Sequence, residues 1–348
     1  MIQGGTALGK VTLQSIADEV GVSRMTVSNA FSRPDQLSAA LRARILDAAE
    51  QLGYVGPDPA ARALARGRVG SVGMLLNGAL SEAFEDQVSA EFVASVADEL
   101  ASRGLALTVL TPPKDDDFVP ARDVAIDGAL VYTCEPHSAG VEWLARRSLP
   151  VVAVDQDLGD DVPGVRVDDR DGARLGARHL LELGHRQIGI LALGRTGPGG
   201  APQDSDSYPA RQRLGGWREV LLGAGVEPMV ALAPYEPREA AVAAARRLLK
   251  SAPLTAVLCF SDVFAHAVVL AAEELGRSVP GDLSVVGYDD APFATTVRPP
   301  LTTVRQDISA KGHLAAGMLA DLLAGRPAES QLLPATLVVR GSTAAPHA

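Results

Sequence analysis

The sequence predicts an α/β protein with two parts, a small helical head-piece followed by a two-lobed body built on parallel sheets. Two observations predict it. Residues 12–31 have the apolar spacing of two short helices joined by a tight turn, and from residue 71 onward short apolar runs alternate with helical segments. The chain has 348 residues, of which 47% are hydrophobic. This composition is enough to fill the cores of a head-piece and a large body.

The first predicted helix begins after Thr12, whose hydroxyl is placed to take up a free backbone N–H. Gly21 ends that helix and gives the backbone the freedom for a tight turn. Ser23 caps the second helix. A third amphipathic helix is expected over residues 38–52, ended by Gly53. The residues expected to face the core are Leu13, Ile16, Ala17, Val20, Val27, Ala30, Phe31, Leu41, Ile45, Ala48 and Leu52.

The second helix has a polar outer face that suits the major groove of DNA, where the second helix of a helix-turn-helix lies. That face consists of Arg24, Met25, Thr26, Ser28 and Asn29. The alternative is structural, because two short amphipathic helices joined at a glycine also occur in ordinary helical domains.

The segment that follows, residues 54–68, is interrupted by Gly56, Pro57 and Pro59 before a short helical run. A helix over residues 59–66 is too short to be stable alone, so we expect it to form only when paired on DNA. The chain carries a net charge of −10, but the part through Arg68 has eight basic and six acidic residues, a net +2, and the remainder is −12. A mildly basic head on an acidic body is typical of a specific dimeric DNA-binding protein.

These segments together resemble the LacI/GalR (lactose-repressor) family of bacterial transcriptional regulators, in the family's order over nearly the whole chain. The resemblance implies a periplasmic-binding-protein-like body, a homodimer on a palindromic operator, and a small effector between the lobes. Repression is expected rather than activation, because no segment resembles one that contacts RNA polymerase. The matching pieces are VTLQSIADEVGVSRMTVSNAF, LGY, PDPAARALARGR, RLGGW (213–217), SVVGYDD (284–290) and PPLTTVRQD (299–307).

The resemblance also implies the domain organisation. A head-piece is expected over residues 10–56, a hinge helix and linker over 57–68, and an effector-binding and dimerisation domain over 69–340. Within that domain the N-terminal lobe takes about 69–167 and 306–333, and the C-terminal lobe about 168–305 and 334–340, so that the chain crosses between lobes three times.

Roles on DNA follow from side-chain chemistry. Arg24 is expected to hold guanine bidentately and Met25 to touch a thymine methyl. Asn29 departs from the arginine common in the family, and reading adenine and bonding phosphate both remain open for it. The resemblance implies that Leu64 enters the minor groove as a wedge. Its register depends on the match of ARAL at 61–64, and simple hinge packing is the alternative. Thr12, Ser23, Thr26 and Ser28 are expected to hold phosphates, and Tyr54, Ala61 and Arg62 complete the expected DNA contacts.

The body shows continuously apolar, β-branched runs, which are typical of parallel strands covered on both faces. Expected strands are SVGMLL, LALTVL, GALVYT, PVVAVD, QIGILAL, TAVLCF and LSVVGYD, and expected helices cover 84–102, 171–183, 209–223, 238–249 and 263–276.

Because ligands bind at the carboxyl ends of such strands, the residues that follow them are effector candidates. The candidates are Asn77, Asp155, Ser261, Asp262 and Asp289, with Arg213 at an expected turn in RLGGW, and Phe84 and Phe293 as apolar walls or packing residues. Carboxylates with a guanidinium suit vicinal hydroxyls or a carboxylate. Family proteins hold polar ligands with the residues matching Arg213 and Asp289. The alternative for these side chains is strand-end capping or ion pairing between the lobes.

Ser261-Asp262 replaces the Asn-Asp pair frequent in the family, so the ligand class stays open. We expect a sugar-like effector. The alternatives are a nucleoside-type co-repressor, or a cytoplasmic small-molecule-binding protein of the same two-lobed fold.

The remaining sequence features do not indicate a catalytic site. Residues 194–200, GRTGPGG, lack the lysine of a phosphate-binding loop and are expected to form a surface loop at the mouth of the cleft. Cys134 and Cys259 end apolar runs and are expected to be buried thiols. The six histidines have no metal-ligand spacing, so we expect no metal, no cofactor and no enzyme. No apolar run reaches membrane length, and a cytoplasmic protein is expected.

Overall fold

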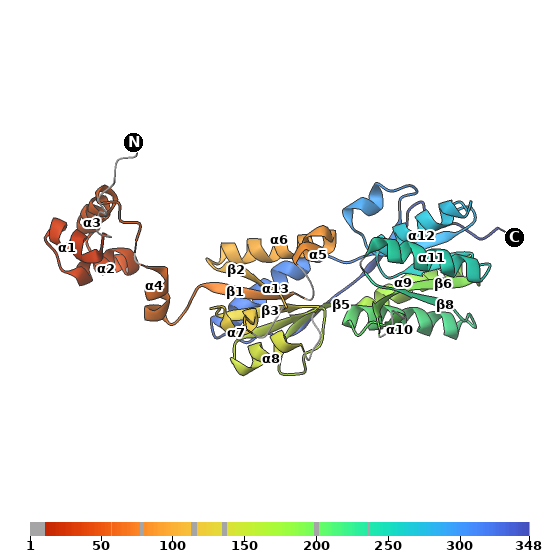
Figure 1. Cartoon of the computed structure of the whole chain (residues 1–348), viewed down its shortest axis with the longest axis horizontal. Coiled ribbons are helices and arrows are strands. Elements are labelled where there is room, and N and C mark those ends of the chain that lie inside the picture. Colours follow the sequence, from red (N-terminus) through yellow and green to blue (C-terminus); the bar gives the residue numbers. More distant parts are fainter. Residues whose placement is uncertain are drawn as a thin grey trace. The chain divides into compact units, whose positions relative to one another are not determined.

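The computed structural model describes residues 11–56, 58–76, 80–112, 117–133, 138–197, 202–235 and 237–347. The chain forms two compact units, Met1–Val69 and Gly70–Ala348, which we call the head and the body. Figure 1 shows the head as a cluster of helices and the body as two sheets with helices on their faces.

The head contains three helices around a small core, followed by a fourth short helix. The helices are α1 (Leu13–Val20), α2 (Arg24–Ser32), the 3-10 turn η1 (Pro34–Gln36), α3 (Ala39–Gln51) and α4 (Pro59–Arg66). Its core is formed by Ile16, Ala17, Val27, Ala30, Ile45, Ala48 and Ala49, with Leu13, Val20, Phe31, Leu41 and Leu52 packed against it.

The predicted caps of the first two helices are confirmed. The backbone N–H of Ser15 donates to Thr12 Oγ1, and Ser15 Oγ accepts from the Thr12 backbone in return, which makes a capping box. Ser23 Oγ accepts from the backbone N–H of Thr26 at 3.0 Å. Gly21, at φ 74°, lies in the left-handed region between the two helices, where a side chain would be strained.

The first lobe of the body is a sheet whose paired strands all run parallel, in the order β12-β5-β4-β3-β1-β2. Side chains of β1 alternate between two cores, since Val72 and Met74 face α6 and α13 while Leu75 faces α7 and α8. The strands are β1 (Ser71–Leu76), β2 (Ala106–Leu110), β3 (Gly128–Tyr132), β4 (Val151–Val154), β5 (Gly164–Val167) and β12 (Gln331–Leu333). The helices are α5 (Leu80–Glu85), α6 (Gln87–Ser102), α7 (Pro120–Asp123), α8 (Ala139–Arg146) and α13 (Ile308–Leu323).

The second lobe is a seven-stranded sheet in the order β13-β11-β10-β9-β6-β7, with β8 also paired to β6. Only β13 and β7 pair antiparallel within its described residues. The strands are β6 (Ile188–Thr196), β7 (Pro202–Asp204), β8 (Met229–Ala233), β9 (Ala256–Cys259), β10 (Ser284–Asp289), β11 (Thr302–Arg305) and β13 (Thr336–Val338). The helices are α9 (Asp169–Glu182), α10 (Tyr208–Gly223), α11 (Arg238–Ser251), α12 (Asp262–Glu274) and the 3-10 turn η3 (Pro292–Thr295).

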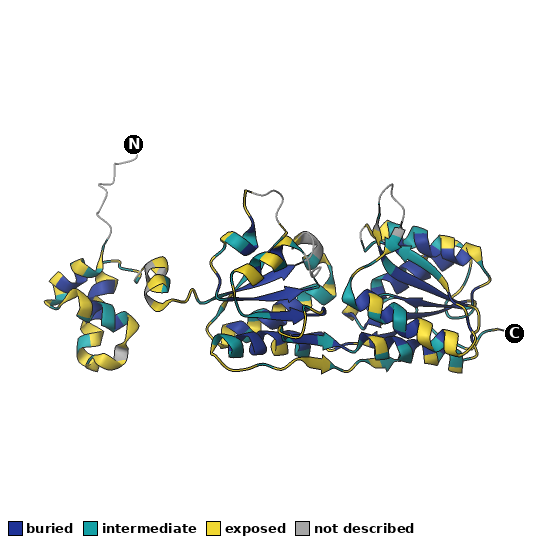
Figure 2. Ribbon diagram, turned by 90° about the horizontal axis from the view of Figure 1, so that it is seen from below, coloured by how far each residue is buried: buried dark blue, intermediate teal, exposed yellow. Residues whose placement is uncertain are grey.

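The chain passes between the two sheets three times. It leaves the first sheet after β5, returns from β11 to α13, and crosses again between β12 and β13. Figure 2 shows the buried residues concentrated on the strands of both sheets, with exposed residues on the outer faces of the helices.

Each of the seven predicted strands overlaps an observed one, but several elements differ from prediction. The helix expected over 84–102 is two helices, because the Asp86 carboxylate caps α6 by accepting from the N–H and hydroxyl of Ser89. Residues 194–196 are not part of a loop, since β6 continues through Thr196 and pairs with β7. The strands β5, β7, β8, β11, β12 and β13 were not predicted from the sequence.

RLGGW is not a turn, because residues 213–217 lie inside α10. Its glycines bring α10 against α9 instead. A Cβ on Gly216 would lie 2.3 Å from the carbonyl oxygen of Arg170, and one on Gly215 would lie 3.0 Å from the Arg170 guanidinium. Close packing of two helices is therefore the reason for this glycine pair.

Candidate binding cavity and nucleic-acid interface

The outer face of α2 carries the side chains that the sequence predicts to meet DNA. Arg24 and Met25 are exposed, Met25 by 73%, whereas Thr26, Ser28 and Asn29 are partly buried. Asn29 Nδ2 donates to Gln36 Oε1 in η1 at 3.2 Å, so its amide has a fixed orientation. An apolar side chain, Met25, therefore lies exposed beside the cation Arg24 on this face of α2, where a partner could contact both.

The other predicted DNA residues lie in different surroundings. Thr12 and Ser23 use their hydroxyl oxygens as helix caps. Tyr54 packs edge-on against Phe31 with ring centroids 5.6 Å apart, and burial together with the nearby Asp58 raises the pKa of its phenol. Arg62 is exposed, and Leu64 is 86% exposed. The side chain of Ala61 lies outside the described part of the chain.

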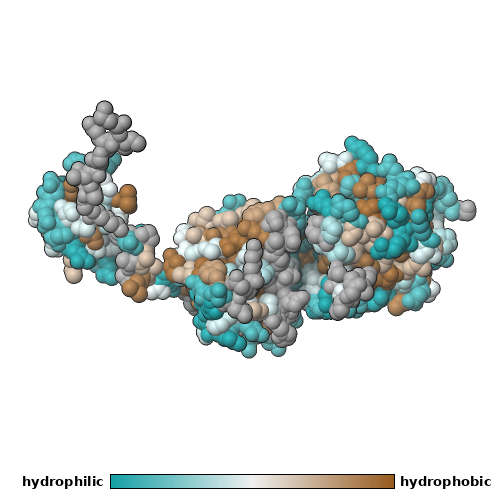
Figure 3. Space-filling model, viewed as in Figure 1, coloured by the Kyte–Doolittle hydropathy of each residue, from teal (hydrophilic) through white to brown (hydrophobic). Residues whose placement is uncertain are grey.

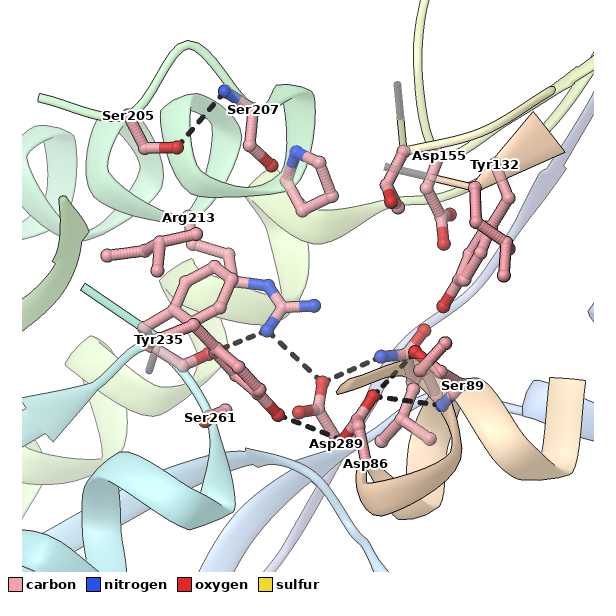
Figure 4. Close-up of a pocket in the computed structure, with 18 of the residues that line it drawn as sticks. Asp86, Ser89, Tyr132, Asp155, Ser205, Ser207, Arg213, Tyr235, Ser261 and Asp289 are labelled. Atoms are coloured by element: carbon pink, nitrogen blue, oxygen red, sulfur yellow. Dashed lines mark hydrogen bonds and ion pairs between the residues drawn. The ribbon is translucent and has the colours of Figure 1, made fainter. Parts of the chain in front are cut away.

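The body contains a cavity of about 370 Å³ where the carboxyl ends of its two sheets meet. Strand-end residues of both lobes line it, together with the first turn of α6 and side chains of α10 and α13. Figure 4 shows Arg213 and Tyr235 on one side and Asp155 and Tyr132 on the other. The lining residues are Leu76, Ala83, Asp86, Val88, Ser89, Tyr132, Thr133, Asp155, Leu193, Ser205, Ser207, Pro209, Arg213, Tyr235, Phe260, Ser261, Asp289, Gln306 and Lys311.

Arg213 is held through two of its three guanidinium nitrogens, Nε and Nη1. Its Nε donates to Asp169 Oδ1 at 2.7 Å, and its Nη1 donates to Asp289 Oδ1 at 3.1 Å and to the Phe260 carbonyl at 2.6 Å. The guanidinium also lies 3.6 Å from the centroid of the Tyr288 ring. Burial alone would lower the pKa of Arg213, but the two carboxylates outweigh it and raise that pKa. The guanidinium is therefore a permanent cation at the cavity wall.

A second buried ion pair lies in the first lobe. Lys311 Nζ, on α13, donates to Asp155 Oδ2 at 2.5 Å and to Gln306 Oε1 at 2.9 Å. Gln306 Nε2 in turn donates to Asp289 Oδ1 at 2.7 Å. The two ion pairs are thus connected through one amide, and the connection runs from β4 of the first lobe to β10 of the second. Such a network is satisfied only while the lobes keep this arrangement.

Asp155 is strained as well as buried. Its φ is 53°, in a region that side chains rarely adopt, and its Oδ1 has no hydrogen-bond partner among the described residues. A buried acceptor without a donor costs about 1–3 kcal/mol. A hydroxyl brought into the cavity by a small molecule would supply the missing donor.

Tyr235 joins the lobes at another point, because its hydroxyl donates to Asp86 Oδ1 at 2.9 Å. Burial and the charge of Asp86 raise its pKa, so the phenol stays protonated and remains a donor. In the first lobe, Tyr132 stacks on Phe92 with centroids 4.3 Å apart. The cavity consequently combines charged groups with aromatic walls.

Among the predicted effector residues, the structure brings Asp155, Arg213, Ser261 and Asp289 together at the cavity. It leaves Phe84, which is 55% exposed on α5, outside the lining. Phe293 is packed instead against the core of the second lobe, near the ring of His266. Asn77 lies outside the described residues.

Asp262 is placed away from the cavity, contrary to expectation. Its Oδ2 accepts from the backbone N–H of Ala291 at 2.8 Å, and its Oδ1 accepts from Thr303 Oγ1 at 2.5 Å. Burial and the neighbouring Asp289 raise its pKa to about 8. The first position of α12 turns this side chain toward β10 and β11, while Ser261 before it caps the helix and faces the cavity.

Sequence reasoning missed several lining residues, above all Lys311, Asp86 and Tyr235. A lysine among the apolar residues of α13 is a signal, since buried lysines need a partner. Asp86 and Tyr235 offer no comparable signal, because Asp86 lies at the boundary between α5 and α6 and Tyr235 follows β8, and the sequence pattern predicted neither that boundary nor that strand.

Other predicted features can be placed within the described residues. Cys259 is buried, and burial raises the pKa of its thiol, while Cys134 lies outside them. No group of three potential metal-binding side chains occurs in the described part of the chain. None of the described helices is both long and apolar enough to span a bilayer.

Comparison with known proteins agrees with both halves of this description. Residues 12–56 match the family described as bacterial regulatory proteins, lacI family, and residues 177–343 match the periplasmic binding protein-like domain. The HTH-type transcriptional regulator IpsA of Corynebacterium glutamicum is 36% identical over 351 residues, covering 96% of this chain and 98% of that protein.

Two solved structures are similar over almost the whole chain. The lac repressor dimer bound to operator and the anti-inducer ONPF has a TM-score of 0.79 and 28% identity, covering 96% of this chain and 99% of the other. The complex of the transcriptional regulator CelR with cellobiose has a TM-score of 0.70 and 29% identity, covering 95% of this chain and 99% of the other.

Proposed function

The chain belongs to the lacI family of bacterial regulatory proteins and is a DNA-binding transcriptional regulator, and we propose that it is a homodimeric repressor controlled by a sugar. The dimer binds a palindromic operator through its two heads. The sugar occupies the cavity between the lobes and changes the affinity for the operator. The strongest support is that cavity, in which two buried ion pairs and two aromatic walls converge from both sheets.

The exposed face of α2 supports the DNA-binding half of the proposal. In this proposal, Arg24 holds guanine and Met25 packs on a thymine methyl in the major groove. The exposed side chain of Leu64 on α4 enters the minor groove as a wedge and kinks the duplex. Of the remaining predicted contacts, Asn29 reads adenine or bonds phosphate. The others, namely Thr12, Ser23, Thr26, Ser28, Tyr54, Ala61 and Arg62, hold the DNA backbone and set the register.

The chemistry of the cavity supports a sugar. Carboxylates and a guanidinium bind vicinal hydroxyls, and tyrosine and phenylalanine rings pack against the C–H faces of a sugar ring. The similar CelR structure holds cellobiose. In this proposal Asp155, Arg213, Ser261 and Asp289 contact the effector directly.

Apolar side chains on the surface of the body support self-association. Phe84 on α5 and Leu270 on α12 are 55% and 39% exposed. Figure 3 shows hydrophobic patches over α6 and around α12 on one face of the body. Exposed apolar patches of this kind are typical of protein–protein interfaces.

Control by an effector follows from the bonds between the lobes. A ligand that favours one angle between the lobes shifts the population of the state that binds DNA, and operator binding must shift ligand affinity by the same factor. Since the two connections through Gln306 and Tyr235 cross from lobe to lobe, a ligand among them alters that angle.

The test is to select sequences bound by the purified chain from random duplexes, and then to titrate sugars and nucleosides into the complex. A palindromic site whose affinity changes with a sugar is expected. An Arg24→Ala variant, altered at an exposed position, is expected to lose the selected sequence while keeping its melting temperature. If no sequence is enriched but a small molecule still binds, the chain is a small-molecule-binding protein and the proposal is wrong.

A further inference from the structure

We propose that residues 340–346 form a strap, which the uncharged rings of His179 and His185 attach to the second lobe, and that protonation of these rings releases it. The strap follows β13 and contains no helix or strand of its own. Attachment and release are properties of the free chain and need neither DNA nor an effector, so they stand apart from the proposed function.

Hydrogen bonds attach the strap to β10 and β11 of the second lobe. Ser342 is fully buried, and its Oγ donates to the Val285 carbonyl at 2.6 Å and accepts from the backbone N–H of Thr302 at 2.8 Å. The N–H of Val285 donates to the Ser342 carbonyl, and the N–H of Arg340 donates to Thr302 Oγ1 at 2.9 Å. None of these bonds belongs to the pairing of two strands within the described residues, so the strap can detach locally while the sheet stays intact.

His185 lies beneath the strap and is only 1% exposed. Its Nε2 lies 2.9 Å from the carbonyl oxygen of Ala344, and because a carbonyl only accepts, Nε2 carries the proton of the neutral ring. Nδ1 is then the acceptor and lies 2.9 Å from Thr255 Oγ1. The neutral ring therefore satisfies both of its nitrogens while the strap is attached.

A second imidazole contacts the neighbouring residue of the strap. His179, on α9, has its Nε2 3.0 Å from Thr343 Oγ1. That hydroxyl also lies 3.0 Å from Thr302 Oγ1 on β11. Two histidines consequently hold two consecutive residues of the strap, Thr343 and Ala344.

Both rings are in surroundings that favour the neutral form. Burial lowers the pKa of His185 below its ordinary value of 6.5, the Ala344 carbonyl raises that pKa only in part, and the charge of His179 lowers it further. Burial also lowers the pKa of His179, against the opposing charge of Glu182. Among the described residues, neither imidazole has a carboxylate as a hydrogen-bond or ion-pair partner, so nothing there neutralises an imidazolium.

The other charged groups on the surrounding elements are engaged elsewhere. Arg186, beside His185, donates through Nη1 to the His185 backbone carbonyl at 2.8 Å. Asp282, before β10, accepts from the backbone and hydroxyl of Ser278, and the charge of His347 helps to lower its pKa. Arg340, on the strap itself, pairs with Asp290.

Proton uptake is therefore linked to release of the strap. Release hydrates both rings, and their pKa values return toward the ordinary 6.5. Between the lowered pKa and 6.5 the open state binds a proton that the attached state does not, so acidification raises the open population. Attachment is fully present above pH 6.5 and weakens below it, by at most about tenfold for each histidine between pH 7.5 and pH 5.5.

The first residue of the strap carries the effect to a strained turn. Arg340 Nη2 donates to Asp290 Oδ1 at 2.5 Å, and Asp290, with φ 58°, directly follows Asp289. Arg305 is the second guanidinium bound to Asp290. Release of the strap removes one of these two partners, so protonation of the histidines loosens the turn that carries Asp289.

Hydrogen exchange of the full chain, followed by mass spectrometry at pH 5.5, 6.5 and 7.5, measures the opening of the strap. Exchange times are scaled for the intrinsic effect of pH on amide exchange, and the readout is the protection of peptides covering residues 339–346. Protection is expected to fall by about three- to tenfold from pH 7.5 to pH 5.5, while peptides of α12 keep theirs. An equal loss over the whole second lobe would be global destabilisation and would contradict local release.

Variants separate the proton from the attachment. The double variant His179→Gln with His185→Gln keeps neutral donors and acceptors and is expected to lose the pH dependence. Ser342→Ala is expected to lower protection at every pH with the same dependence, because it leaves the Thr302 N–H and the Val285 carbonyl without their partner.

His313→Gln, at an exposed position on α13, is the matched control and is expected to behave as the wild type. Wild-type pH dependence in the double histidine variant refutes the inference. So does a wild-type strap that is equally protected at pH 5.5 and pH 7.5, a result that decides the matter even if the double variant does not fold.

Discussion

Asp262 supports the cavity without lining it. It accepts from the backbone of Ala291, two residues beyond Asp289, and Gly287 leaves the room it needs, since a Cβ there would lie 2.1 Å from Asp262 Oδ1. Asp289 and Asp290 both have positive φ, at 104° and 58°. A buried carboxyl group therefore anchors a strained turn that directs Asp289 toward Arg213.

The pKa of Asp262 makes this anchor sensitive to pH. Burial and the neighbouring Asp289 raise its pKa from the ordinary 3.8 to about 8, so between these pH values the folded state holds a proton that the unfolded state has released. Stability contributed by this group is hence lost as the pH rises, by at most about 1.4 kcal/mol per pH unit. Asp262→Asn is expected to flatten the decline in the free energy of unfolding between pH 5 and pH 8.

Urea unfolding of the wild type and of Asp262→Asn at each pH measures this difference. The exposed Asp160→Asn variant serves as the control and is expected to follow the wild type. A variant with the wild-type slope would show that Asp262 is ionised in the folded chain.

Asn29 is the residue at which the operator preference is expected to depart from that of related regulators. Its amide is oriented by Gln36, and an oriented amide can pair with the N6 and N7 edge of adenine. Asn29→Ala is expected to lose about 1–3 kcal/mol of discrimination at one base pair. Binding to a set of single-substitution operators measures it. A uniform loss of affinity over all of them would instead assign Asn29 to phosphate.

At the level of single elements, Gly216 allows α10 to pack closely against α9. Gly216→Ala places a Cβ 2.3 Å from a backbone oxygen, which cannot move without shifting α9. We expect the free energy of unfolding to fall by about 1–3 kcal/mol. Gly223→Ala at the end of the same helix meets no atom within 4 Å and is expected to be neutral or to stabilise by up to about 1 kcal/mol. Equal stability of the two variants would contradict the packing argument.

In the short helix α4, Leu64 is expected to contribute to operator binding and not to the stability of the chain. Leu64 is 86% exposed, so Leu64→Ala is expected to leave the melting temperature unchanged. Operator affinity and operator bending are expected to fall together, because the wedge that opens the base step is lost. Electrophoretic bending assays with the selected operator measure both. Leu222→Ala, at an exposed leucine of α10, is the control, and wild-type bending by Leu64→Ala would exclude the wedge.

For the body as a whole, the hydrogen bond from Tyr235 to Asp86 joins the two lobes at the cavity, and we propose that it couples ligand binding to the geometry of the lobes. Tyr235→Phe removes one bond between lobes while keeping the aromatic wall. We expect affinity for the sugar that binds the wild type to fall by about 0.5–1.5 kcal/mol. The factor by which that sugar changes operator affinity is expected to fall as well.

Calorimetry gives the sugar affinity of Tyr235→Phe, and fluorescence anisotropy gives its operator affinity with and without the sugar. Tyr208→Phe, a tyrosine outside the cavity lining, is the control. Wild-type coupling in the Tyr235 variant would show that this bond plays no part in communication between the lobes.

Much of the fold was predictable because it depends on neighbouring residues. The caps at Thr12 and Ser23, the glycine turn at Gly21 and the apolar runs of the central strands are properties of short segments, and the structure confirms them. The order of these segments also identified the family, which the comparisons confirm.

The sequence by itself therefore determined the helices of the head, seven of the strands, their order, and the strand ends at which a ligand site is predicted. Only the tertiary structure decided which polar groups face one another. Lys311 reaches Asp155 across 156 residues, Tyr235 reaches Asp86 across 149, and Asp262 turns away from the cavity toward Thr303. The physical reason is that a buried polar group pairs with a group that the packed lobes bring within hydrogen-bonding distance. Which groups come that close depends on the packing of whole sheets and not on spacing along the sequence.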